Sequence, residues 1–336
     1  MTRRIAVILG GRSSENAISI ASAASVVDAL ERRGHDVVTI EIDRAGRWQL
    51  ETHEPGSETE PGSELIRLPP REVATTLADV DVVFPVLHGP FGEDGTVQGL
   101  LELAGVPYVG AGVLASALCM DKDVFKSVLR DHGVPVTANI TLRLGDAPRN
   151  PFGFPVFIKP ARLGSSVGIT KAHDEDELRA GVALAFEHDE KVLVEQFVSG
   201  VEVEVGVLGN LRPTASLPGE IVVKANEWYD YEAKYDEGEM DLVVPPRITD
   251  AQIERVQELA VRAFVATDCE GMARVDMFVR NDGEVLVNEL NTIPGFTSTS
   301  VYARLFAASG VPYAELLERL AELAVERFDR RSQLRY

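Results

Sequence analysis

Acidic and amide side chains stand near the end of a stretch that otherwise reads as a buried hairpin, GMARVDMFVRNDGEVLVNELN at residues 271–291. An Asp-Gly pair in its middle is the dipeptide preferred in two-residue type I′ turns. Counting back from that turn predicts that Asp276 lies opposite Glu289 and Arg274 opposite Asn291, all on one face of the hairpin.

Two facing carboxylates repel each other, so a hard divalent cation is the simplest group to hold Asp276 and Glu289 together. Asn291 would add a neutral oxygen ligand, and Arg274 a fixed positive charge. Alternation along the second strand would also put Val287 on the side of Glu289. The alternative is a solvated sheet face with an Arg-Asp ion pair, and this segment alone leaves both interpretations open.

A glycine-rich loop, GSSVG at residues 164–168, lies between two predicted strands and follows Lys159. Backbone N–H groups of such a loop, with a lysine as a point charge, can cover phosphates. Ser165 and Ser166 belong to this loop. Lys122 stands in the first turn of a helix, where a cation opposes the helix dipole and is better explained by a nearby phosphate. The simpler alternatives are a hairpin tip and a solvated lysine.

Other candidates stand at element ends. Glu195, Val198 and Glu202 surround a turn between two strands, where the acids could contact an amino group or ribose hydroxyls. Glu15 follows a Gly-Gly turn at the start of a helix, where the dipole favours a carboxylate anyway. His88 ends a strand at the sheet edge where α/β proteins bind ligands. Exposed glutamates and a structural turn histidine are the alternatives.

The segment 225–246 packs aromatic side chains among charges without helical or strand periodicity. This pattern is typical of a mobile lid, from which Lys234 and Tyr235 would reach a ligand only on closure. A solvated surface loop is the alternative. The lysines, the glycine loop, the oxygen-rich site and the lid together predict chemistry on a magnesium-bound nucleotide.

The apolar pattern predicts three domains to position these groups. A strand, a helix and a second strand within residues 4–42 are typical of a parallel α/β sheet, and we assign residues 1–115 to this N-terminal domain. Residues 116–203 predict a small central α+β domain with the glycine loop. Residues 204–336 predict a C-terminal α+β domain with the lid and the metal site.

Composition narrows the function further. The chain has 336 residues and a net charge of −20, which argues against nucleic acid or a membrane surface as a partner. No segment approaches the roughly 20 apolar residues of a membrane span. Cys119 and Cys269 are too few for a disulfide framework and predict buried thiols in a reducing compartment. We therefore expect a cytoplasmic protein.

Taken together, the motifs resemble those of the bacterial D-alanine–D-alanine ligases, members of the ATP-grasp superfamily. The resemblance spans residues 4 to about 325 and rests on motifs in matching order and spacing: LGGRSSE, LHGPFGEDGTVQG, MDK, KPARLGSSVG, YDYEAKY, ARVDMFV and NELNTIPGFTSTS. It implies a three-domain ATP-grasp fold with ATP held between the central and C-terminal domains.

The resemblance also implies how the nucleotide is bound. Lys122 and Lys159 would contact the phosphates of ATP, with Ser166 in the covering loop. Glu195 and the Val198 backbone would contact the adenine, and Glu202 the ribose. Two Mg²⁺ ions, which Mn²⁺ could replace, would be held by three residues that the hairpin places together: Asp276, Glu289 and Asn291.

For the reaction, the resemblance implies that Glu15 binds the amine of a first D-alanine, whose carboxylate attacks the γ-phosphate to give an acyl phosphate. The amine of a second D-alanine then attacks the acyl carbon. Arg274 and the Gly295 N–H would stabilise the oxyanion, and Ser300 would bind the second carboxylate. The remaining implied roles are a substrate contact from His88, charge neutralisation by Lys234, and a lid-locking triad of Glu15, Ser165 and Tyr235.

We therefore predict an ATP-dependent ligase that makes D-alanyl-D-alanine for peptidoglycan precursor synthesis, working as a homodimer like others of this family. A ligase with another acceptor, such as D-serine, D-lactate or another amino acid, is the first alternative, although the EAKY sequence ending at Tyr235 favours an amine. A nucleotide-binding homologue without catalysis would bind ATP without turnover. A dehydrogenase is disfavoured because the GxGxxG fingerprint is missing.

Overall fold

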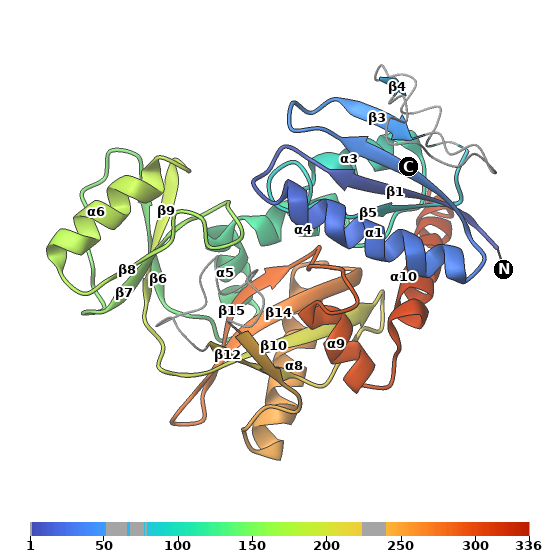
Figure 1. The fold of residues 1–336 in the computed structure, drawn as a ribbon. Coiled ribbons are helices and arrows are strands. Elements are labelled where there is room, and N and C mark those ends of the chain that lie inside the picture. The colour runs from blue at the N-terminus through green and yellow to red at the C-terminus, as the bar shows by residue number, and fades with distance from the viewer. Residues whose placement is uncertain (1, 52–65, 68–76, 78, 224–239, 336) are drawn as a thin grey trace.

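The computed structural model describes residues 2–51, 66–67, 77, 79–223 and 240–335 (Figure 1). Within this part the chain forms three β-sheets, of five, four and six strands. Figure 1 shows the five-stranded sheet and the four-stranded sheet at opposite sides of the molecule, with the six-stranded sheet below them. Residues 52–65, most of the predicted lid and both lid residues Lys234 and Tyr235 lie outside the described residues.

The N-terminal sheet has the order β4-β3-β2-β1-β5. Its strands are β1 (Arg4–Gly10), β2 (Asp36–Ile42), β3 (Trp48–Glu51), β4 (Ile66–Arg67) and β5 (Val82–Pro85). Strand β1 pairs in parallel with β2 and β5, as predicted, but β3 and β4 add antiparallel pairs at one edge. The parallel pairs confirm the predicted parallel α/β arrangement, and the edge strands are antiparallel because a short loop such as the one from β2 to β3 joins antiparallel neighbours.

Helices cover both faces of this sheet. Helix α1 (Asn16–Arg32) and helix α10 (Tyr313–Ser332) bury one face, where Leu316 and Leu320 pack with Ile5 and Val7 in one core. Helix α3 (Thr96–Ala104) packs on the other face. The C-terminal helix therefore returns to the first sheet and ties the two ends of the chain together (Figure 1).

The four-stranded sheet is antiparallel and has the order β6-β9-β7-β8. It follows helices α4 (Val113–Met120) and α5 (Lys122–Asp131), and α6 (Glu175–Phe186) packs against it. Its strands are β6 (Asn139–Arg143), β7 (Val156–Pro160), β8 (Thr170–Ala172) and β9 (Lys191–Gln196). The glycine loop joins β7 to β8, as the sequence predicted.

The six-stranded sheet has the order β13-β12-β10-β14-β15, with β11 paired to β10. Its strands are β10 (Gly200–Gly209), β11 (Thr214–Ala215), β12 (Gly219–Val223), β13 (Met240–Val243), β14 (Gly271–Arg280) and β15 (Val285–Asn291). Helix α8 (Asp250–Ala266) covers one face, and α9 (Val301–Ala308) follows β15. Strand β13 corrects the predicted lid, because residues 240–243 pair with β12 instead of belonging to an irregular segment.

The β14–β15 hairpin pairs Asp276 with Glu289 and Arg274 with Asn291, as counted from the sequence. The route to this register was nevertheless wrong in two places. Arg280 N donates to Glu284 O at 2.8 Å, so the turn has three residues rather than two. A bulge beyond Val287 then shifts the register back by one.

The bulge also reverses the predicted side of Val287. This residue pairs with Met277 and packs in the core under α8, as does Leu290. Glu289 therefore faces away from that core, because the extra residue, Asn288, changes the alternation. One strand thus supplies hydrocarbon to the core and polar groups to the opposite face.

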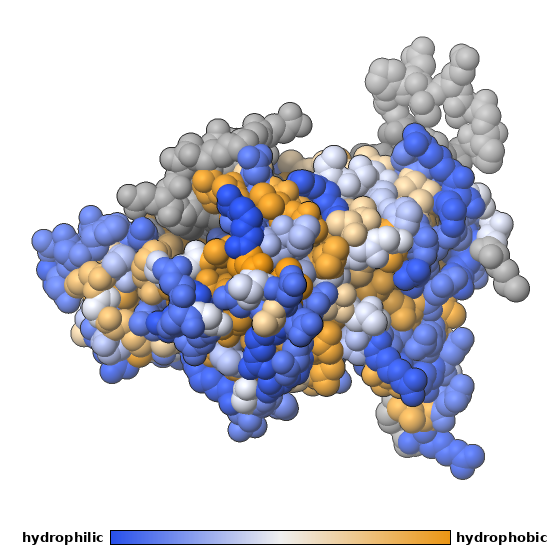
Figure 2. Space-filling view, turned by 90° about the horizontal axis from the view of Figure 1, so that it is seen from below, coloured by the Kyte–Doolittle hydropathy of each residue, from blue (hydrophilic) through white to orange (hydrophobic). Residues whose placement is uncertain are grey.

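Hydrophilic side chains spread over the outer parts of the face seen from below, and hydrophobic ones show between them toward its middle (Figure 2). None of the helices among the described residues combines the length and the apolar character needed to cross a bilayer.

Candidate functional site

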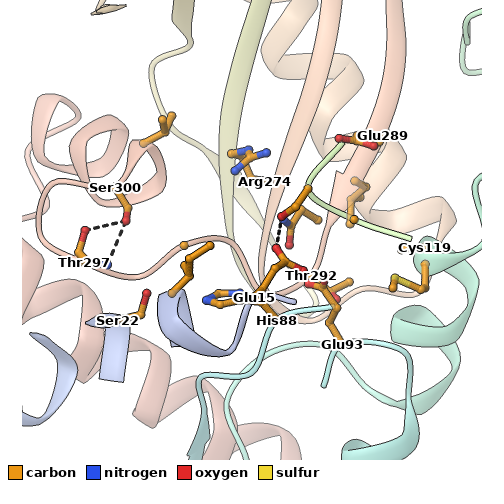
Figure 3. Close-up of a pocket in the computed structure, with 18 of the residues that line it drawn as sticks. Glu15, Ser22, His88, Glu93, Cys119, Arg274, Glu289, Thr292, Thr297 and Ser300 are labelled. Carbon is orange, nitrogen blue, oxygen red and sulfur yellow. Dashed lines mark hydrogen bonds between the residues drawn. The ribbon is translucent and has the colours of Figure 1, made fainter. Parts of the chain in front are cut away.

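A cavity of about 580 Å³ lies where the three sheets meet. Residues from distant parts of the chain form its wall, and Figure 3 shows them converging on one space. Nine of the predicted site residues line it: Glu15, His88, Lys122, Ser165, Arg274, Glu289, Asn291, Gly295 and Ser300.

The glycine loop reaches the cavity in a strained conformation. Ser165 and Ser166 have φ of 50° and 58°, a left-handed region that non-glycine residues seldom adopt. The start of the loop is tied to α5, since Lys122 Nζ donates to Leu163 O at 2.6 Å. Ser165 Oγ donates a hydrogen bond to Glu15, which brings the loop against the N-terminal domain.

Glu195 lies buried between two lysines. Its Oε1 accepts from Lys159 Nζ at 2.6 Å, and its Oε2 accepts from Lys126. Burial alone would raise the pKa of Glu195, but the two lysines outweigh burial and lower it to about 2. Burial lowers the pKa of Lys126 to about 8, although the charge of Glu195 opposes this shift. Below that pH both lysines are charged, and two ammonium groups share the one carboxylate of Glu195. Lys159 also donates to Asn288 at 3.3 Å, which links the central sheet to β15.

The carboxylate face of the hairpin is buried and ion-paired. Arg274 holds Asp276 with two hydrogen bonds of 2.7 Å and contacts Glu204 at 2.9 Å. The Arg-Asp pair of the alternative interpretation is therefore present, but the side chains are only 14% and 5% exposed, so the face is not solvated. Glu289 Oε2 lies 3.8 Å from Lys122 Nζ.

The loop after β15 closes the far side of the cavity (Figure 3). Thr297 N donates to Ser300 Oγ at 3.0 Å, and the two hydroxyls are 2.8 Å apart. A Cβ at Gly295 would lie 3.3 Å from Ser300 Oγ, so a larger residue would crowd this corner. Phe296 N donates to Ser22 Oγ at 3.2 Å and anchors the loop on α1.

His88 is fixed by its ring. Nδ1 lies 2.9 Å from Ile293 O, and because a carbonyl only accepts, Nδ1 carries the hydrogen. Burial lowers the pKa of His88, so the imidazole is neutral and Nε2 holds a lone pair.

The structure does not bring every predicted residue to this cavity. Lys159, Ser166, Glu195 and Asp276 lie outside its lining, as do Val198 and Glu202 near the β9–β10 turn. Lys159 and Glu195 instead lie between the four-stranded and six-stranded sheets, where a nucleotide would be expected.

Sequence reasoning missed Lys126, Asn288 and Glu93. Lys126 is one of only seven lysines in the chain, and it follows Lys122 by one helical turn, which was a usable signal. Asn288 could not be found because the bulge that turns it toward Lys159 has no sequence mark. Glu93 lies in the GEDG part of a quoted motif, but nothing in its spacing indicated burial.

An antiparallel sheet with a glycine loop, facing a second sheet with carboxylates, is the arrangement of the ATP-grasp class of ligases. Models of two families match the chain: "D-ala D-ala ligase N-terminus" over residues 4–111 and "D-ala D-ala ligase C-terminus" over residues 128–322. The chain belongs to the D-alanine–D-alanine ligase family.

Individual relatives agree with this assignment. The chain is 47% identical to a D-alanine–D-alanine ligase of Mycobacterium bovis, with 96% of each chain covered. It is 42% identical to one of Geobacillus thermodenitrificans, covering 100% of this chain and 99% of the relative.

Solved structures show the same fold. The D-alanine–D-alanine ligase of Coxiella burnetii has a TM-score of 0.84 and 38% identity, covering 98% of this chain and 97% of the other. A D-Ala:D-Ser ligase of Enterococcus faecalis has a TM-score of 0.84 and 37% identity, covering 96% and 100%. The predicted ATP-grasp fold is thereby confirmed.

Proposed function

We propose that this chain joins two D-alanines into D-alanyl-D-alanine with ATP as the source of energy. The observation that carries the proposal is the cavity closed by all three sheets, in which Glu15 accepts a hydrogen bond from Ser165 and Arg274 lies across the space (Figure 3). The names of the relatives support the choice of D-alanine.

ATP would lie between the four-stranded and six-stranded sheets. Lys122 and Lys159 would contact its phosphates under the loop that holds Ser166. The Val198 backbone would contact the adenine and Glu202 the ribose. Both oxygens of Glu195 already accept hydrogen bonds from lysines. The main effect of Glu195 would therefore be to hold Lys159 in place, in addition to its proposed contact with the adenine.

The hairpin fits Mg²⁺ by its donor set. Asp276 and Glu289 face each other with hard oxygen atoms, although Arg274 shares Asp276 and Asn291 Oδ1 accepts from Ile293 N at 3.0 Å. Among the described residues no cluster of three or more His, Cys, Asp or Glu side chains is placed to hold a metal. Two Mg²⁺ ions there, with Mn²⁺ as a substitute, would neutralise phosphate charge.

The side chains around the cavity then have separate tasks. Glu15 would bind the ammonium of the first D-alanine and leave its carboxylate to attack the γ-phosphate, which gives an acyl phosphate and ADP. The amine of the second D-alanine would attack the acyl carbon and expel phosphate. Arg274 and the Gly295 N–H would stabilise the oxyanion in that step.

Two further contacts would fix the substrates. Ser300 would bind the second carboxylate, and the Nε2 lone pair of His88 would accept from a substrate donor. Lys234 and Tyr235 keep their proposed parts in charge neutralisation and in locking the lid with Glu15 and Ser165.

The test is phosphate release from Mg-ATP with D-alanine alone, and with D-alanine beside D-serine or D-lactate, with products identified by mass. We expect D-alanine-dependent phosphate and the mass of the dipeptide. Mixed products with D-serine or D-lactate in preference to the dipeptide would assign another acceptor. ATP binding without amino-acid-dependent turnover would reject the ligase.

We also propose a cytoplasmic location, where ATP is available, and a homodimer, which light scattering would test. The divisions near residues 115 and 203 remain proposals for the limits of the three domains.

A further inference from the structure

Glu93 is a buried carboxyl on the cavity wall to which the proposed reaction gives no task. It lies in the loop between β5 and α3, and its side chain lines the same cavity as Glu15 and His88 (Figure 3). The residue is only 9% exposed. Its Oε1 accepts from Gly89 N at 3.0 Å, whereas its Oε2 has no hydrogen-bond partner among the described residues.

An unpaired buried carboxyl oxygen costs free energy, and the cost is larger for a charged group than for a neutral one. Such a group is stabilised either by taking up a proton or by contact with a positively charged ligand. Both are available to Glu93, because it borders the cavity in which the charged amino acid is proposed to bind.

Glu15 is the carboxylate whose charge acts on Glu93. A Cβ placed on Gly164 would lie 3.5 Å from Glu15 Oε2 and 3.8 Å from Glu93 Oε1, so both carboxyl groups border the same point of the glycine loop. Two carboxyl groups in one buried site repel and do not both ionise readily. The titratable and charged groups that face Glu93 from the neighbouring elements are Glu15, His88, Cys119, Lys122 and Arg274.

These surroundings decide the charge of the empty site. Burial first, and then the charge of Glu15, raise the pKa of Glu93 to about 8, against smaller opposing effects of Lys122 and Arg274. At pH 7 Glu93 is therefore mostly protonated. His88 is neutral, so Glu15 carries the negative charge at this end of the cavity.

We propose that Glu93 is the second carboxyl of the ammonium subsite: it keeps a proton while the subsite is empty and releases it to solvent when the ammonium of the first amino acid binds beside Glu15. The ligand supplies the positive charge that lets both carboxylates ionise. Glu93 acts through the charge of this subsite and is a positioning residue. The inference rests on the proposed function, which places the ammonium at Glu15.

Calorimetry of D-alanine binding at pH 7 tests this, with Mg²⁺ and a non-hydrolysable ATP analogue present. Buffers of different ionisation enthalpy give the number of protons released per active site when D-alanine saturates it. We expect close to one proton for the wild-type protein at pH 7 and fewer at pH 8. Glu93→Gln should release none, while Asp94→Asn, the same change in the next residue, should behave as the wild type.

Kinetics give a second readout that needs no variant. The KM for D-alanine should rise about tenfold for each pH unit below 8, because only the ionised Glu93 favours binding. In Glu93→Gln the KM should be higher at pH 8 but nearly constant from pH 8 to 6. A merely structural role would not alter this pH dependence.

The outcomes separate the two proposals. Dipeptide synthesis by a wild-type protein that binds D-alanine without proton release, or with a flat KM profile, would overturn the role of Glu93 and leave the ligase intact. Proton release that persists in Glu93→Gln would assign it to another group. No D-alanine-dependent phosphate release at all would reject the function itself.

Discussion

Replacing Glu195 by glutamine should strongly destabilise the protein, because it leaves two buried lysines without their shared carboxylate. The side chains of Glu195 and Lys126 are 2% and 1% exposed, and that of Lys159 is 9% exposed. Removing one partner of a buried ion pair typically costs about 3–5 kcal/mol, since the charge left behind cannot reach water.

The pKa of Glu195 gives the same magnitude. The lysines hold it at about 2, against 4.5 for an ordinary glutamate. At about 1.4 kcal/mol for each pH unit, this difference corresponds to about 3 kcal/mol of stability. Because the folded pKa is the lower one, this contribution is complete above pH 4.5 and is lost as the pH falls toward 2.

Thermal unfolding of the ligand-free protein measures the loss. A change of about 3 kcal/mol should lower the midpoint at pH 7 by roughly 4 °C. Glu220→Gln is the matched control, because Glu220 pairs with an Arg247 side chain that is 65% exposed and screened by water. Lys126→Met should also cost less than Glu195→Gln, since Lys159 still pairs with Glu195.

Two results would refute this reasoning. One is an equal fall of the midpoint in the two glutamine variants at pH 7. The other is a loss in Glu195→Gln that stays constant down to pH 3, because the ion pair would then contribute nothing to the difference.

Three further perturbations follow from the site. Lys234→Ala should leave ATP affinity nearly unchanged and lower turnover by at least about tenfold, as a charge-neutralising lid residue requires, and wild-type turnover would exclude that role. Asp276→Asn should raise the Mg²⁺ concentration for half-maximal activity, and an identical Mg²⁺ titration would remove Asp276 from the metal site. Asn288→Ala keeps the bulge, loses only the contact to Lys159, and should cost about 1 kcal/mol.

Much of the fold could be predicted from the sequence, because local patterns determine it. The continuous apolar run of β1 predicted a strand buried on both faces, and the structure confirms it. Gly133 follows α5 with a φ of 65°, the left-handed conformation in which glycine commonly ends a helix, so a glycine at this place in the sequence indicates where the helix stops. The antiparallel edge strands were not predicted, since pairing direction depends on a connection whose path is not written in the strand itself.

The site residues that belong to sequence motifs could be predicted, whereas those whose role depends on burial in the assembled fold could not. Glu15 and Ser165 are 150 positions apart, and only the resemblance to a known family joined them before the hydrogen bond was seen. Lys126 lies on the same helix as Lys122, yet its burial depends on Thr137 and Glu195 from other elements. Burial of a charge is a property of the assembled fold, so a single sequence does not show it.

The hairpin shows how a correct prediction can rest on an incomplete account. A two-residue turn followed by a regular ladder pairs Asp276 with Glu289. A three-residue turn followed by one bulge gives the same pair, because the extra residue in the turn and the extra residue in the strand offset each other. The two accounts differ in the position of Val287, which only the bulge sends into the core. They also differ in Asn288, which only the bulge makes available to Lys159. The bulge keeps Asp276 opposite Glu289 and places one extra residue, Asn288, between Glu289 and the core residue Val287, so β15 serves the core and the nucleotide face at once.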